Sequence, residues 1–369
     1  MQNNTKKLAH LVSVRGLAAW LVVLFHSLAL WYSALPQTPM PLLRFVSHGY
    51  LAVDFFFVLS GFIIFINYYE KFDANFRHNL LTFYWNRITR IYPVHLLMLG
   101  AYLLLCAAFL YASATRSAPP GYSASAFWQS VFLVHAWTGT PLTWNVPSWS
   151  ISAEWFVYLL FPFIAALLRT RIRGVAAHFF GVLAMLVALY LVYSLTGSRT
   201  LGADDIGMPL VRALGEFMLG ALAGSLYIYH SPLLQRCRHW VVLAIAAVVS
   251  VMLSLDLPNY AIIPGLFFLM VIYLIIDKGW LAKVLSHRVL VYLGEISYST
   301  YLVHYFVYDV FRAGWVHSGQ SVSILALLTS FLVVLGLSML MYKYVEIPAQ
   351  AYLRAGRWSK QPAPLRFRP

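Results

Sequence analysis

One arginine and one histidine lie inside the first apolar segment of the chain. From Leu11 to Tyr32 nearly every residue is apolar, and the basic exceptions are Arg15 and His26. A guanidinium binds anions such as phosphate, and an imidazole near neutral pH can act as a general base. On a helix, this spacing leaves the two residues about 20° from a common face and about 16 Å apart along the axis. The two groups would therefore share one side of a single helix.

Ionisable groups inside a membrane span are costly unless they face protein or water, so this pair predicts a functional site. The alternative is an arginine that reaches the inner headgroups and a histidine that is hydrogen-bonded between helices. Two carboxylates in later apolar segments are candidate partners. Asp54 in VDFFFVLSGF would orient or charge-balance His26, or else cap the start of its helix. Glu154 in PSWSISAEWFVY lies deeper, and would be a general base or orienter with His26, or a structural partner for an arginine.

Other segments supply groups that could bind a substrate. Arg87 and Arg90 are three positions apart, so adjacent guanidiniums could hold phosphate oxygens; anchoring by lipid phosphate is the alternative. Trp149 fits an aromatic belt at a membrane interface and is also a candidate for contact with substrate. Tyr298, Tyr301 and Tyr305, with His304 beside them, form a hydroxyl-bearing stripe on one helix face. This stripe suits a sugar or pantetheine path, or helix packing with satisfied hydroxyls.

The composition indicates what must position these groups. The chain has 369 residues, of which 61% are hydrophobic and only 10% are charged, whereas soluble domains carry about 25% charged residues. This excludes an ordinary soluble protein and predicts an all-α, polytopic membrane protein. In a membrane protein the excess of basic residues, a net charge of +14, sets the orientation of the spans, and no nucleic-acid partner is expected. The histidines lack a spacing such as HxxxH, so no metal site is expected.

About ten transmembrane helices can be drawn, each long enough to cross the bilayer. They cover approximately 11–32, 50–69, 91–111, 149–168, 174–195, 209–229, 239–255, 260–277, 290–311 and 321–344. With this layout 21 of the 26 basic residues fall on one side, so the positive-inside rule places both termini in the cytoplasm. We expect a transmembrane domain over 1–348 and a short basic cytoplasmic tail over 349–369. The 112–148 connection, on the other side, is a candidate lid.

Five motifs, in this order, resemble those of the acyltransferase family 3 integral-membrane proteins. They are R-x10-H in the first segment, VDFFFVLSGF, RITRIYP, PSWSISAEWFVY and LGEISYSTYLVH, and the resemblance extends from Arg15 to about Pro348. By this resemblance Arg15 and His26 match the functionally essential pair of the family. The other motif positions are occupied by Arg87, Arg90, Glu154, Tyr298 and His304. Thr300 departs from the pattern, because the family usually has a bulkier apolar residue there.

The resemblance implies an enzyme of the bacterial inner membrane. Its members move an acyl group, usually acetyl from acetyl-CoA, to a hydroxyl of a cell-envelope or exported carbohydrate. It implies acyl-CoA as a donor substrate, no permanently bound cofactor, and a carbohydrate or glycolipid acceptor. It leaves open the acceptor, the length of the acyl group and the oligomeric state.

The mechanism predicted from these residues assigns each group a task. Arg15, Arg87 and Arg90 would hold the anionic end of CoA, and His26 would deprotonate the acceptor hydroxyl, with its tautomer set by Asp54 or Glu154. A covalent acyl-histidine is the other route. A proton-coupled transporter of a small acid or glycan precursor, with His26, Glu154 and His304 as relay, is the competing function. It predicts internal symmetry, which the sequence does not display.

Overall fold

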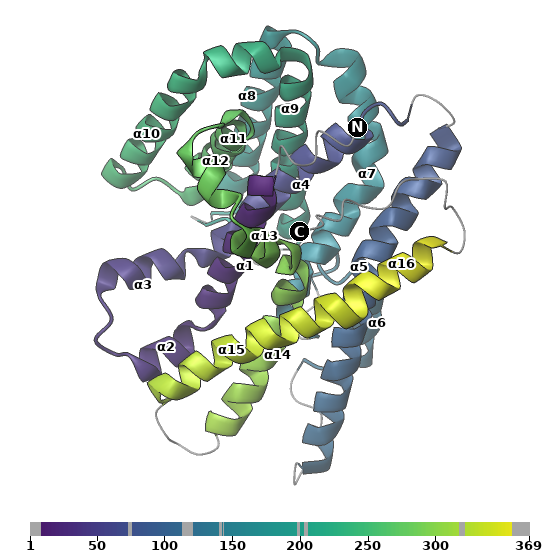
Figure 1. Cartoon of the computed structure of the whole chain (residues 1–369), viewed down its shortest axis with the longest axis vertical. Coiled ribbons are helices and arrows are strands. Elements are labelled where there is room, and N and C mark those ends of the chain that lie inside the picture. The colour runs from purple at the N-terminus through teal and green to yellow at the C-terminus, as the bar shows by residue number, and fades with distance from the viewer. Residues whose placement is uncertain are drawn as a thin grey trace.

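The computed structural model describes residues 9–72, 76–112, 121–139, 142, 144–197, 200–202, 206–316 and 322–355, and within these ranges every regular element is a helix (Figure 1). The all-α prediction is therefore confirmed. Lys6, Lys7 and most of the predicted tail lie outside the described residues.

The helices follow one another in chain order with short connections. They are α1 (Ala9–His26), α2 (Leu28–Ala34), α3 (Met40–Ser47), η2 (Gly49–Leu51), α4 (Ala52–Tyr68), α5 (Phe76–Ala112), α6 (Ala124–Val131), η3 (Val146–Ser148), α7 (Trp149–Arg171), α8 (Val175–Leu195), α9 (Met208–Arg236), α10 (Arg238–Ser254), α11 (Asn259–Ile276), α12 (Trp280–Leu285), α13 (Arg288–Glu295), α14 (Ser297–Val316), α15 (Ile324–Met341), η4 (Tyr342–Glu346) and α16 (Ile347–Ala355).

Eight helical stretches in the described ranges are long and apolar enough to cross a membrane, judged by length and composition. The helices that would complete the predicted ten are α10, which has 17 residues, and α14. The count of ten and the cytoplasmic position of both termini stay predictions. A multi-pass arrangement also accounts for the surface of α8 and α10, where large apolar side chains are exposed, among them Phe179, Phe180, Trp240 and Leu253.

The first predicted span is divided at His26. α1 ends at this residue, and the chain continues after Ser27 as the separate short helix α2. The hydroxyl of Ser27 donates to the carbonyl oxygen of Leu24 at 2.7 Å, a local bond that competes with regular helical geometry. His26 is therefore the last residue of α1.

Two pairs of helices touch backbone to backbone. A Cβ atom on Gly61 of α4 would lie 2.0 Å from the carbonyl oxygen of Phe217 in α9, and one on Gly294 of α13 would lie 1.9 Å from the carbonyl oxygen of Val12 in α1. Only glycine permits these approaches. Gly61 and Gly294 therefore serve close helix packing, and the contacts fix the depth of Ser60 and Arg15 relative to the neighbouring helices.

Candidate active site

A cavity of about 150 Å³ lies between α1, α4, α5, α7 and α14. A single water needs about 10–15 Å³ on this measure, so the space exceeds that of an ordinary buried water site. It is lined by Arg15, Val53, Phe56, Phe57, Leu59, Ser60, Ile63, Ile64, Arg87, Arg90, Ile91, Ser150, Ile151, Glu154, Tyr158, Ser297, Tyr298 and Tyr301. Six of the ten residues that the sequence proposed for the site are in this lining. The other four, His26, Asp54, Trp149 and His304, are not.

Three arginines face the cavity, and they differ in how they are held. Arg90 forms an ion pair with Glu346, and its guanidinium lies 5.3 Å from the centre of the Tyr298 ring. Arg87 instead lies 5.7 Å from each of three aromatic rings, those of Tyr68, Phe83 and Tyr158. Such rings attract a cation but leave its N–H groups available for an anion.

Neither Arg15 nor Arg87 takes part in an ion pair within the described ranges. The Nε atom of Arg87 is buried and has no hydrogen-bond partner among the described residues. A buried cation without a counter-ion is costly, so this end of the cavity is suited to an anionic ligand.

Glu154 lies in the cavity wall beyond the arginines. Its Oε1 accepts a hydrogen bond of 2.5 Å from the hydroxyl of Ser60, whose oxygen is also 3.4 Å from that of Tyr158. Glu154 is thus placed to act within the cavity, with Ser60 as its hydrogen-bond partner. A role as a base or orienter stays a prediction.

The opposite end of the cavity is formed by Ser150 and Tyr301. The two hydroxyl oxygens are 2.8 Å apart, and Tyr301 also bonds the carbonyl oxygen of Pro147 at 3.0 Å. Tyr298 donates to the carbonyl oxygen of Ile91 at 2.6 Å. The hydroxyls of Tyr298 and Tyr301 are therefore bonded within the protein, while their two rings line the cavity. Contact of these residues with substrate stays a prediction.

A pair of histidines lies beyond this end. The ring of His304 is 5.8 Å from that of Tyr301 and is fully buried, whereas His26 is half-buried. The Nε2 atom of His304 is 3.1 Å from Nδ1 of His26, although the residues are 278 positions apart. The sequence proposed Asp54 or Glu154 as the orienting partner of His26. The structure places His304 there instead, because α14 packs against α1.

The hydrogen-bond partners define the tautomers of both rings. Nδ1 of His304 lies 3.2 Å from the carbonyl oxygen of Thr300, which can only accept, so this nitrogen carries the proton. In the neutral ring Nε2 is then an acceptor for the Nδ1 proton of His26, which also lies 3.2 Å from the carbonyl oxygen of Val22. The neutral His26 ring consequently keeps its Nε2 lone pair free, which is the form that a general base requires.

Asp54 belongs to a separate buried cluster at the start of α4. Each of its carboxylate oxygens lies 2.5 Å from a nitrogen of Arg212, and Asp54 is fully buried. Arg212 also lies 5.2 Å from the centre of the Trp149 ring, so Trp149 is part of this cluster as well. Catalytic and substrate-binding roles for these two residues stay predictions.

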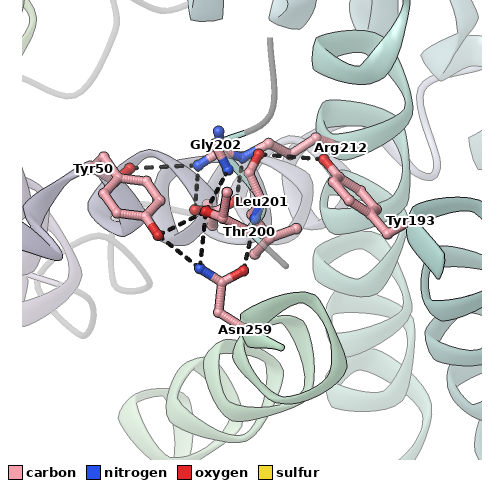
Figure 2. Close-up of polar contacts among 8 residues, drawn as sticks. Tyr50, Tyr193, Thr200, Leu201, Gly202, Arg212 and Asn259 are labelled. Atoms are coloured by element: carbon pink, nitrogen blue, oxygen red, sulfur yellow. Dashed lines mark hydrogen bonds and ion pairs between the residues drawn. The ribbon is translucent and has the colours of Figure 1, made fainter. Parts of the chain in front are cut away.

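The same cluster extends into a polar network that joins several helices (Figure 2). Asn259 of α11 donates to the hydroxyl of Tyr50 at 2.7 Å and accepts from the backbone of Leu201 at 2.6 Å. The hydroxyl of Tyr50 is in turn 2.9 Å from that of Thr200. This network holds the beginnings of α4, α9 and α11 together, which is a structural task.

Comparison with known proteins agrees with the site. Residues 11–343 match the model of acyltransferase family 3, described as an acyltransferase domain. The chain belongs to this family. The acyltransferase is also 28% identical over 328 residues to acyltransferase MdmB of Streptomyces mycarofaciens, a match that covers 82% of this chain and 79% of MdmB.

Staphylococcal relatives are longer than this acyltransferase. A putative O-acetyltransferase of Staphylococcus aureus strain COL is 24% identical over 335 residues, and O-acetyltransferase OatA of strain NCTC 8325 is 25% identical over 345 residues. In both cases the match covers 83% of this chain but only 53% of the relative. The chain thus spans about half the length of these relatives. No solved structure gives a significant match.

Four further residues of the site were not predicted from the sequence. Ser60 and Tyr158 line the cavity without any charge that would have marked them. Arg212 lies within the predicted span 209–229, and a charge in an apolar segment was the signal that it would need a carboxylate partner. Glu346 stands two residues after the last predicted span, and only the fold brings it to Arg90.

Proposed function

We propose that this acyltransferase moves an acyl group, in the first instance acetyl, from acyl-CoA to a hydroxyl of a cell-envelope or exported carbohydrate. It would do so as a multi-pass enzyme of the bacterial inner membrane. The observation that carries the proposal is one cavity with unpaired guanidiniums at one end and a hydrogen-bonded histidine pair beyond the other. Family membership favours acyl transfer over proton-coupled transport as the use of these ionisable groups.

The arginine end is suited to the phosphates of CoA. Guanidiniums hold phosphate oxygens by charge-assisted, often bidentate hydrogen bonds, and neither Arg15 nor Arg87 forms an ion pair with a carboxylate of the described residues. Arg90 remains partly exposed, with 26% of its side chain accessible, while Glu346 holds it toward the cavity. The positive-inside pattern of the sequence predicts that this end faces the cytoplasm, where acyl-CoA is made.

The distance to His26 matches the length of the donor. Arg15 and His26 are separated by about 16 Å along α1, roughly the reach of an extended pantetheine arm. A donor with its phosphates at Arg87 and its arm in the cavity would therefore bring the thioester toward Tyr301 and the histidine pair. The acceptor would approach from the opposite side of the membrane, where α1 ends at His26.

The chemical step then needs one proton transfer in each direction. Nε2 of His26 removes the proton of the acceptor hydroxyl while the hydroxyl oxygen attacks the thioester carbonyl carbon. The carbon–sulfur bond then breaks, and the protonated His26 gives this proton to the thiolate of CoA. His304 acts as a positioning residue, because its Nε2 holds the Nδ1 proton of His26 and thereby keeps the catalytic nitrogen free. The same nitrogen could also accept the acyl group in a covalent relay.

The experiment uses membranes from cells that make the full chain or its His26→Ala variant. Cell-envelope polysaccharide is analysed by mass spectrometry for added acetyl groups, and purified protein is supplied with radiolabelled acetyl-CoA. General base catalysis contributes about 10²- to 10⁴-fold, so the variant should lose nearly all transfer. His239→Ala, an exposed histidine of α10, is the matched control and should retain it. Normal transfer by a membrane-inserted His26→Ala protein would refute the assignment.

A further inference from the structure

The last described helix, α16, packs against α5 beside the arginine end of the cavity (Figure 1). It begins after the π-helical turn η4, which contains Glu346, and it lies beyond the residues that match the family model. The indole of Trp85 donates to the carbonyl oxygen of Leu353 at 3.0 Å, which fixes the end of α16 on α5. Part of the segment predicted to be a short basic tail, 349–369, is thus a packed helix.

This packing brings a further guanidinium to the arginine end. Arg354 donates to the hydroxyl of Thr89 at 3.2 Å and lies 3.5 Å from the carbonyl oxygen of Asn86. These partners directly precede Arg90 and Arg87 in the chain, so Arg354 is within electrostatic range of both arginines. Both partners are neutral, and Arg354 forms no ion pair in the part of the chain that the structure describes.

The local charge is therefore unbalanced. The guanidiniums of Arg87, Arg90 and Arg354 come from two helices, and within the described ranges the only ion pair that any of them forms is that of Arg90 with Glu346. Like charges held this close repel one another, and a ligand with several negative charges would offset the repulsion. Arg354 is absent from the cavity lining, so it lies outside the cavity, next to Arg87 and Arg90.

We propose that Arg354 binds the 3′-phosphate of the CoA nucleotide, so that the enzyme distinguishes acyl-CoA from its 3′-dephospho form. This rests on the proposed function. Along the donor, the thioester is followed by the pantetheine arm, the diphosphate and finally the ribose 3′-phosphate. With the arm in the cavity and the diphosphate at Arg87 and Arg90, the ribose 3′-phosphate would lie outside the cavity, next to Arg354. A lipid phosphate is the other source of the same chemistry, and the experiment separates the two.

The experiment compares acetyl-CoA with acetyl-3′-dephospho-CoA in wild-type protein and in Arg354→Ala, using the full chain in lipid nanodiscs. A hydrogen-bonded charge pair of this kind corresponds to about 10-fold or more in KM. We expect the wild type to have a KM about 10-fold lower for the 3′-phosphorylated donor. Arg354→Ala should raise KM for acetyl-CoA by about the same factor, so that the two donors become equal. Arg354→Lys should restore part of the preference, and Arg171→Ala, an exposed arginine of α7, should keep all of it.

Equilibrium binding of CoA and 3′-dephospho-CoA to the same proteins separates this inference from the proposed function. A 3′-phosphate preference that depends on Arg354 supports the inference even if no transfer is found, and that outcome overturns only the proposed reaction. Equal binding of the two nucleotides by the wild type, or no binding of either, overturns the inference. An equal loss for both donors in Arg354→Ala also overturns it and indicates a lipid-phosphate or structural role.

Discussion

Two groups of arginines in the apolar helices of this acyltransferase are held in opposite ways. Arg212 is 4% exposed and is bonded through two nitrogens to Asp54, with the ring of Trp149 beside it. Arg15 and Arg87 line a cavity and have no ion-pair partner in the described ranges. A charge whose partner is part of the protein holds helices together, whereas a charge without one is ready for a ligand.

This contrast separates structure from function where composition alone does not. All three residues are arginines in apolar surroundings, and each by itself marks a functional site under the usual rule for membrane spans. Among the residues that the structure describes, the fold gives an ion-pair partner to only one of them, Arg212. The predictions below test whether that assignment has the consequences expected for stability and for donor binding.

The largest effect is expected from Arg212→Ala. Removing one partner of a buried ion pair leaves the other charge uncompensated and costs about 3–5 kcal/mol. The variant should unfold at a much lower temperature, which a thermal shift measurement in detergent detects. Asp54→Leu combined with Arg212→Met removes both charges at similar volume and should recover most of the stability and retain acyl transfer.

The double variant also tests the catalytic role that the sequence suggested for Asp54. A protein that is as stable as the wild type but transfers no acyl group would show that Asp54 takes part in the reaction. A single Arg212→Ala variant with unchanged stability would contradict the structural assignment of the pair.

For Arg15→Met we expect no loss of stability, in contrast to Arg212→Ala. Since Arg15 forms no ion pair with any described residue, its removal should leave the unfolding temperature unchanged or raise it. The KM for acyl-CoA should rise, because losing a hydrogen bond to a charged group costs about 1.5–3 kcal/mol, or about 10- to 100-fold. Kinetics with acetyl-CoA and a thermal shift on the same preparation measure both effects. A destabilised variant with normal KM would place Arg15 with Arg212, among the structural charges.

Hydropathy predicted most of the helices, because the need for about 20 apolar residues is a local property of the chain. It did not predict that α1 ends at His26 and that α2 follows after Ser27. The extra length of α5, which carries Arg87 and Arg90 inside one helix of 37 residues, was also missed, because its first part is polar. Short-range sequence rules describe spans better than their ends.

Individual residues of the candidate site were predicted, but the residues with which the charged groups form ion pairs were not. Spacing on one helix related Arg15 to His26, and spacing in α5 related Arg87 to Arg90. The contacts of Arg212 with Asp54 and of Glu346 with Arg90 join residues 158 and 256 positions apart, and no local pattern encodes them. In both cases an isolated charge in an apolar segment was visible, but the choice among possible partners required the packing of helices.

The smallest effect is expected from changing His304. Its contact with His26 joins two neutral rings, whereas Arg212 and Asp54 form an ion pair. His304→Phe removes one of the two acceptors of the Nδ1 proton of His26 and leaves the carbonyl oxygen of Val22, a loss of about 1 kcal/mol for one neutral hydrogen bond. The pool of His26 in the reactive tautomer then falls, so kcat should drop about fivefold with KM for acyl-CoA unchanged. His304→Gln, whose amide oxygen can still accept this proton, should recover part of the rate. Equal rates for the two variants would mean that His304 only fills space, and a rise in KM alone would mean that it contacts the donor.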